Sequence, residues 1–114
     1  MARRPVTRHA KVKHILLGCA AVHGDDPRGA ARDRPALEAL VKATLARLKA
    51  GAKFEVVMAE LSEDAYSITS GEPFNVTPDA GLVPRFKDLA LRLKVGEVGV
   101  IITNFGVHIV RRME

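Results

Sequence analysis

Two apolar segments rich in β-branched residues flank the tripeptide Asn104-Phe105-Gly106 near the C-terminal end. Residues 98–103 read VGVIIT, and residues 107–111 read VHIVR. Valine and isoleucine favour strands, and a short break that contains Asn and Gly favours a tight turn. The sequence therefore predicts a β-hairpin here, and with it an antiparallel sheet.

The rest of the chain mixes strand-like and helical patterns. KVKHILL at 11–17 predicts a strand with alternating faces. Apolar residues at helical spacing predict a helix that starts near Asp33 and Pro35 and ends at Gly51, a second from Lys53 and a third from Pro84. The stretch between the second and third helices is expected to be irregular, with a short strand near 74–76. This order of elements is an α+β pattern.

Length and charge suggest one compact domain with a basic end. The chain has 114 residues, and we expect a single domain at 11–114 preceded by a flexible basic tail at 1–10. The five cations of residues 1–14 account for the whole net charge of +5. Such a tail can attract nucleic acid or aid solubility. With no Trp and one Tyr there is no stacking platform, so nucleic acid is an unexpected partner.

Other features exclude several classes of protein. No apolar run approaches the ~20 residues of a membrane span, and the N-terminus lacks the apolar region of a secretory signal. We therefore expect a cytoplasmic monomer without membrane contact. Cys19 is the only cysteine, which excludes an internal disulfide.

Two histidines stand among aliphatic residues in predicted strands. His14 lies in KHILL and His108 in GVHIV. If the first and last strands pair, the two rings can lie side by side; otherwise each histidine bonds separately to a backbone carbonyl. No third ligand stands out for a metal, because His9 and His23 lie in the tail and a loop without ligand-like spacing.

Five segments in order resemble the parvulin-type peptidyl-prolyl cis-trans isomerase (rotamase) family, from Val12 to Met113 apart from the loop at 18–35. They are KHILL at 13–17, KAGAKFEVVMAELSED at 49–64, LVPRFKDLA at 82–90, LKVGEV at 93–98 and TNFGVHIV at 103–110. The resemblance implies a four-stranded antiparallel sheet with three to four helices packed around it. It also implies a folding helper that isomerises X–Pro bonds of peptides or unfolded proteins, with no cofactor or metal.

The resemblance also assigns site residues. His14 and His108 are expected to share a hydrogen-bond network with Asp64 and Thr103. Leu82, Phe86 and Phe74 are expected to form the apolar pocket for the substrate proline. Without the family, Asp64 reads as a surface acid that caps a helix, and Leu82 and Phe86 read as core.

The segment at 71–77 departs from the family pattern. GEPFNVT stands where the family has GGDLGWF, so Glu72 replaces a glycine, Pro73 an aspartate and Thr77 an aromatic residue. The loss of an aromatic wall predicts weak isomerase activity. The alternative is a peptide-binding or chaperone module of the same fold with little turnover.

The loop at 18–35 bears on substrate choice. In phosphate-selective parvulins the corresponding loop carries basic residues that bind the phosphate of a phosphoserine or phosphothreonine before proline. Here its arginines are matched by aspartates, so we expect unmodified X–Pro segments as substrates. The charged residues are Arg28, Arg32 and Arg34, and Asp25, Asp26 and Asp33.

Overall fold

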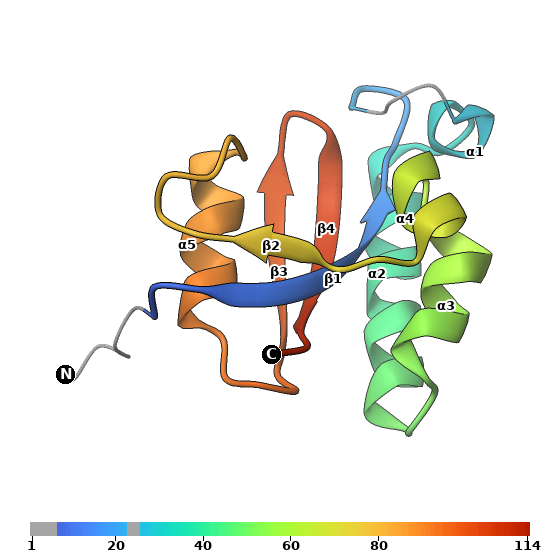
Figure 1. The fold of residues 1–114 in the computed structure, drawn as a ribbon. Helices are drawn as coiled ribbons and strands as arrows, with labels where there is room; N and C mark the ends of the chain where they lie inside the picture. The colour runs from blue at the N-terminus through green and yellow to red at the C-terminus, as the bar shows by residue number, and fades with distance from the viewer. Residues whose placement is uncertain (1–6, 23–25) are drawn as a thin grey trace, which may run out of the picture.

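The computed structural model describes residues 7–22 and 26–114, and these form an α+β fold (Figure 1). Residues 1–6 of the predicted tail, His23 and Asp25 lie outside the described residues. The elements, in chain order, are β1 (Ala10–Leu17), α1 (Pro27–Ala30), α2 (Arg34–Lys49), α3 (Phe54–Leu61), α4 (Ala65–Ser70), β2 (Phe74–Val76), α5 (Pro84–Arg92), β3 (Val98–Thr103) and β4 (Gly106–Arg112).

The four strands form one antiparallel sheet in the order β2-β1-β4-β3. The first and last strands are therefore neighbours at its centre, with His14 opposite Val110 and Leu16 opposite His108. The predicted hairpin is confirmed, because β3 pairs with β4 up to Thr103 and Gly106. This pairing joins segments almost a whole chain apart, and it brings the two histidine-bearing strands together.

Gly106 is needed at the start of β4. Its φ of 132° lies in a region that side chains rarely adopt. A Cβ atom there would also collide with the carbonyl oxygen of Leu17. The glycine lets the hairpin turn close against the end of β1.

The sheet separates two layers of helix, with α5 on one face and α2 and α3 on the other (Figure 1). Alternate residues of β1 and β4 supply the two cores. On the α2/α3 face the buried cluster consists of Ile15, Leu17, Cys19, Leu37, Phe54, Val57, Met58, Val107 and Ile109. On the α5 face it consists of Ala10, Val12, Val76, Phe86, Ala90, Leu91, Leu93 and Val110.

The long helices follow the predicted signals. At α2, Asp33 is the N-cap, and its side chain accepts a hydrogen bond from the backbone N–H of Ala36. Within the described residues there are five helices, because α1 and α4 form in stretches expected to be irregular. Both are short, with four and six residues, so neither shows an apolar repeat that sequence reading could detect. No helix in the described part is long and apolar enough to cross a membrane.

Candidate active site

A chain of hydrogen bonds links four side chains on the α5 face of the sheet. Nδ1 of His14 lies 2.9 Å from Nδ1 of His108, which confirms the predicted proximity of the two rings. Nε2 of His14 lies 2.7 Å from Oδ2 of Asp64, and Nε2 of His108 lies 2.7 Å from Oγ1 of Thr103. The four predicted network residues therefore come together in one continuous line.

The direction of this chain follows from what each atom can do. The carboxylate of Asp64 only accepts, so Nε2–H of His14 donates to it. Nδ1–H of the neutral His108 ring donates to Nδ1 of His14, and Nε2 of His108 accepts from the hydroxyl of Thr103. The Thr103 oxygen in turn accepts from the backbone N–H of Phe105 at 3.1 Å. Each ring nitrogen of the two histidines therefore has a hydrogen-bond partner.

Electrostatics favour the same neutral state of His108. Its burial, with only 5% of its surface exposed, and then the neighbouring His14 lower its pKa to about 4 from 6.5. The carboxylate of Asp64 acts in the opposite direction and does not offset these effects. His108 is thus uncharged at neutral pH, and it lies under an apolar surface rather than in water.

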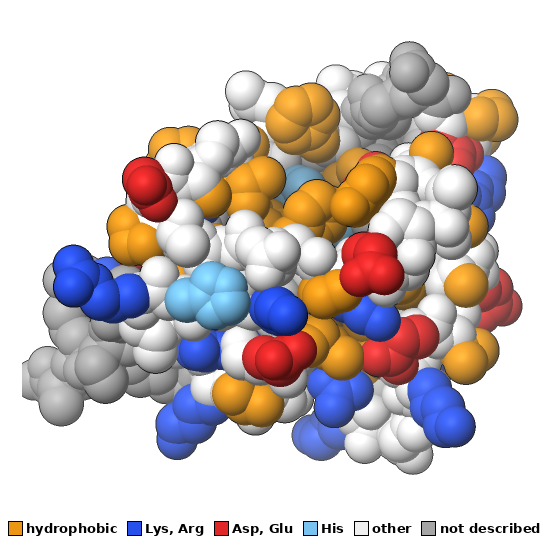
Figure 2. Space-filling view, in the orientation of Figure 1, with side chains coloured by type: hydrophobic (Ala, Val, Ile, Leu, Met, Phe, Trp, Pro, Cys, Tyr) orange, Lys and Arg blue, Asp and Glu red, His pale blue; other side chains and the backbone are white. Residues whose placement is uncertain are grey.

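Aromatic rings enclose the histidine pair. The rings of Phe74 and Phe86 meet the His14 ring edge to face, with centroids 5.0 and 5.6 Å away. Phe86 also lies 5.5 Å from the His108 ring. Figure 2 shows a pale blue histidine surface at the bottom of a hollow surrounded by hydrophobic side chains. The site therefore presents apolar walls above a polar floor.

Leu82 and Tyr66 extend this apolar surface. Leu82 is half-buried and packs against the cluster that contains Phe86. Tyr66, on α4, is 53% exposed, and its ring lies 5.5 Å from that of Phe74. Sequence reasoning missed Tyr66 because α4 was not predicted. Asp64 fixes its place, since Oδ1 of Asp64 accepts from the backbone N–H of Tyr66 at 3.2 Å.

The segment Ser62–Glu63–Asp64 is strapped along β1. The backbone N–H of Leu16 donates to Oγ of Ser62 at 3.1 Å, and that of Glu63 donates to the carbonyl of Leu16 at 2.7 Å. The buried carboxylate of Glu63 accepts from the N–H of Gly18 at 3.0 Å. These bonds hold Asp64 beside His14. No sequence spacing predicts them, because two join backbone N–H groups to side chains and one joins two backbone groups, all about 45 residues apart.

Two arginines of the 18–35 loop pair with carboxylates of the same chain. Arg28 forms an ion pair with Asp26 at 2.8 Å and donates to the carbonyl of Ser62 at 3.0 Å. Arg32 forms an ion pair with Glu63 at 2.6 Å. Arg34 lines a groove on the other face of the sheet. Arg28 and Arg32 therefore brace the Ser62–Asp64 segment.

Thr77 lies just after β2 and is not part of the aromatic enclosure that the structure shows. Its hydroxyl donates to Oδ1 of Asp79 at 2.7 Å. In β2, Phe74 and Val76 face the α5 cluster, and the alternation of a strand turns the next residue away from it. Phe74 supplies an aromatic wall beside His14. The residue at position 77 therefore does not indicate how well this enclosure can bind a proline ring.

Comparison with known proteins adds independent information. A family model described as PPIC-type PPIASE domain matches residues 1–114. Chaperone SurA of Nitrosospira multiformis is 36% identical over 107 residues, which cover 91% of this chain and 22% of the relative. The chain thus spans about a fifth of the length of the curated relatives it matches.

Solved structures of the same fold are similar over almost the whole chain. Peptidyl-prolyl isomerase ESS1 from Candida albicans has a TM-score of 0.77 at 26% identity, covering 97% of this chain and 67% of the other. NmPin, the parvulin of Nitrosopumilus maritimus, has a TM-score of 0.66 at 30% identity, covering 96% of this chain and 100% of the other. The four-stranded antiparallel sheet expected from the sequence is confirmed.

Proposed function

Because the chain belongs to the PpiC-type peptidyl-prolyl isomerase family, we propose that it isomerises X–Pro bonds in exposed segments of other polypeptides. This is the activity of a folding helper. The observation that carries the proposal is the buried hydrogen-bond chain from Thr103 to Asp64, which lies beneath an aromatic surface. A plain core has no need of four linked polar side chains.

The reaction requires a barrier to rotation to be lowered, and no covalent bond has to break. Partial double-bond character of the C–N bond gives the X–Pro peptide a barrier of roughly 18–20 kcal/mol. In the twisted transition state this resonance is lost and the carbonyl is less polar. An apolar surface that excludes water therefore favours the twisted state over the planar one.

The apolar residues bind the proline ring in this proposal. Phe74, Leu82 and Phe86 offer the surface for it. Burying an apolar group about as large as one of these side chains, such as the proline ring, contributes roughly 1.5–3 kcal/mol to binding. Tyr66, which is exposed next to Phe74, widens the surface that a neighbouring substrate residue can touch.

The polar residues fix the floor of the site. With its pKa lowered to about 4, the His108 ring is neutral at neutral pH and presents no charge to the amide, so the apolar character of the pocket is preserved. Asp64 accepts bonds from His14 through Oδ2 and from the N–H of Tyr66 through Oδ1. A carboxylate engaged in this way is an orienting group, and we assign it no nucleophilic role.

Substrates are proposed to be unmodified X–Pro segments. The ion pairs of Arg28 and Arg32 with Asp26 and Glu63 support this choice. A matched pair of peptides, one with phosphoserine and one with serine before proline, tests it. We expect kcat/KM values within a few-fold of each other. A preference of a hundredfold for the phosphorylated peptide would contradict the proposal.

A protease-coupled assay with an Ala-Pro peptide tests the activity itself. We expect turnover by the wild type and at least tenfold less by Asp64→Asn, because the amide cannot accept from His14 in the same way. Asp79→Asn is the matched control, since its partner is Thr77 on the surface. Peptide binding without turnover in the wild type would instead show the non-catalytic binding module.

We also propose a cytoplasmic monomer that does not act on membranes or nucleic acid. Light scattering of the purified protein tests the oligomeric state, and cell fractionation tests the location. Salt-dependent binding to duplex DNA would contradict the last point.

A further inference from the structure

The strand β3 lies at one edge of the sheet formed by the described residues. The backbone carbonyl of Glu97 accepts from the N–H of Arg112 in β4, so residue 97 and alternate residues after it direct their backbone groups to β4. Val98, Val100 and Ile102 direct theirs to the open edge. This edge therefore offers a row of hydrogen-bond donors and acceptors at the spacing of a strand.

The side chains of this edge are apolar and accessible. Val100 is 40% exposed and Ile102 is 63% exposed. The strand VGVIIT contains no charged residue and no proline. Natural edge strands are commonly protected from pairing by lysine, proline or a covering element. The residues that direct backbone groups outward carry none of these protections.

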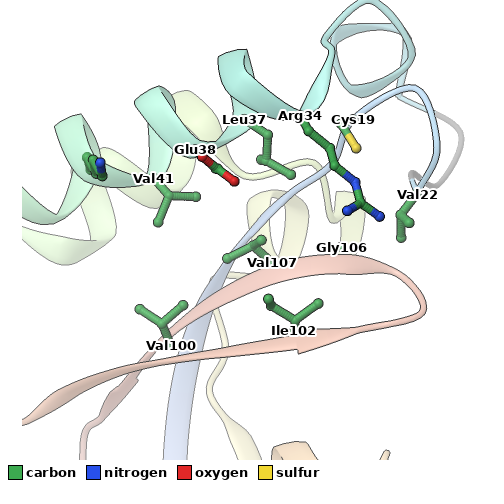
Figure 3. Close-up of a pocket in the computed structure, with 11 residues that line it drawn as sticks. Cys19, Val22, Arg34, Leu37, Glu38, Val41, Val100, Ile102, Gly106 and Val107 are labelled. Atoms are coloured by element: carbon green, nitrogen blue, oxygen red, sulfur yellow. The ribbon is translucent and has the colours of Figure 1, made fainter.

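A groove of about 390 Å³ runs between this edge and helix α2 (Figure 3). In Figure 3, Val41 lies at the same end as Val100, and Arg34 lies toward Ile102. The lining is mainly apolar, from Val22, Leu37, Val41, Val100, Ile102 and Val107. Side chains on one face of an added strand would enter this groove.

The charged residues around the groove indicate which charges a bound polypeptide segment would carry. Arg34, Glu38 and Lys42 are spaced four residues apart on α2 and line the groove. Neither Arg34 nor Lys42 forms an ion pair with any residue that the structure describes. The two cations lie about 12 Å apart along the helix axis. An extended chain covers that distance in about four residues.

We propose that the open edge of β3 and the α2 groove bind an extended segment of another polypeptide by strand addition. The segment is apolar at alternate positions and carries acidic residues about four apart, opposite Arg34 and Lys42. A second copy of this chain fits less well, because β3 brings no carboxylate to these cations. The site is separate from the histidine pair, since Val100 and Ile102 line the groove on the α2 face and His108 lies on the α5 face.

The experiment uses a proline-free peptide, Val-Thr-Asp-Thr-Val-Thr-Asp-Thr-Val, in which both Asp residues and all three Val residues share one face of an extended strand, and amide hydrogen exchange of the full chain followed by NMR. We expect the amides of Val98, Val100 and Ile102 to exchange at least tenfold more slowly when the peptide is saturating. The amides of Gly99 and Ile101, which already face β4, should be unchanged. A peptide with Lys in place of both Asp should bind at least tenfold more weakly at low salt.

Two variants separate the edge from general surface effects. Val100→Lys places a charge on the edge and should abolish binding while leaving isomerase activity unchanged. Val95→Lys is the matched control, because Val95 is 65% exposed in a turn outside the groove, and it should bind the peptide normally. The proposal is overturned if the three amides stay unprotected, if the peptide shifts the resonances of His14 and Phe86 instead, or if protein concentration alone protects the edge, as pairing of two copies would.

Discussion

The two faces of the central strands are built from alternate residues of the same segments, yet they differ in kind. On the α2/α3 face, Ile15 and Ile109 join an apolar cluster around Phe54. On the α5 face, His14 and His108 take the corresponding places beside Phe86. Both faces are well buried, so stability alone does not explain the polar residues. This difference is the reason we propose the α5 face as the catalytic one.

The largest expected effect compares one phenylalanine from each face. Phe54→Ala and Phe86→Ala should each lower the free energy of unfolding by about 3–5 kcal/mol, because both rings are buried. Of the two variants, only Phe86→Ala should also lower kcat/KM per folded molecule, because the Phe86 ring contacts the histidines and the Phe54 ring lies on the other face. Denaturant unfolding and the coupled peptide assay measure the two quantities.

The milder changes Phe54→Leu and Phe86→Leu keep the comparison informative if either alanine variant fails to fold. Equal activity of the two leucine variants would break the distinction between the faces. It would also show that the proline does not bind next to Phe86.

The next effect is the pH dependence of stability. The pKa of His108 is about 4 in the folded protein and 6.5 when unperturbed, so between these values the unfolded chain binds more protons. The contribution is fully present above pH 6.5 and is lost as the pH falls toward 4. We expect the free energy of unfolding to fall by roughly 2–3 kcal/mol over this window.

Two substitutions assign that pH dependence to the α5 face. His108→Asn should flatten the slope of the free energy of unfolding between pH 4 and 6.5. His9→Asn, which changes an exposed histidine, should leave it as in the wild type. A steep slope that persists in His108→Asn would show that the pH dependence comes from other groups. His14 and Asp64 are the titratable groups that face the His108 ring.

A smaller effect compares two threonine hydroxyls, one from each face. Thr103 donates to His108, and the buried Thr44 donates to the carbonyl of Leu40 at 2.7 Å. Thr103→Val and Thr44→Val should each destabilise the fold by about 1 kcal/mol, the net value of a typical hydrogen bond. Turnover should fall several-fold for Thr103→Val alone. Equal turnover of the two variants would remove Thr103 from the site.

Sequence patterns predicted the strands and helices that are long enough to show a regular arrangement of apolar residues. Alternation in KVKHILL predicted β1, and β-branched segments around the turn at Asn104 predicted β3 and β4. The resemblance then placed His14 and His108 together. The short helix α4, and with it Tyr66, could not be predicted because six residues are too few to show a period. The strap from Ser62 to β1 was also missed, since side chain to backbone bonds leave no mark on residue spacing.

The smallest expected effect concerns Thr77, where sequence reasoning expected a missing aromatic wall to weaken catalysis. The structure shows the rings of Phe74 and Phe86 beside His14, whereas Thr77 bonds to Asp79 beyond the end of β2. Thr77→Phe should therefore change kcat/KM on a Phe-Pro peptide by less than about twofold, which is under ~0.5 kcal/mol. Phe74→Leu, the matched change within the enclosure, should lower it by more. If Thr77→Phe raised turnover tenfold while Phe74→Leu had no effect, the proline would bind toward the end of β2 and away from the histidine pair, and the proposed pocket would be misplaced.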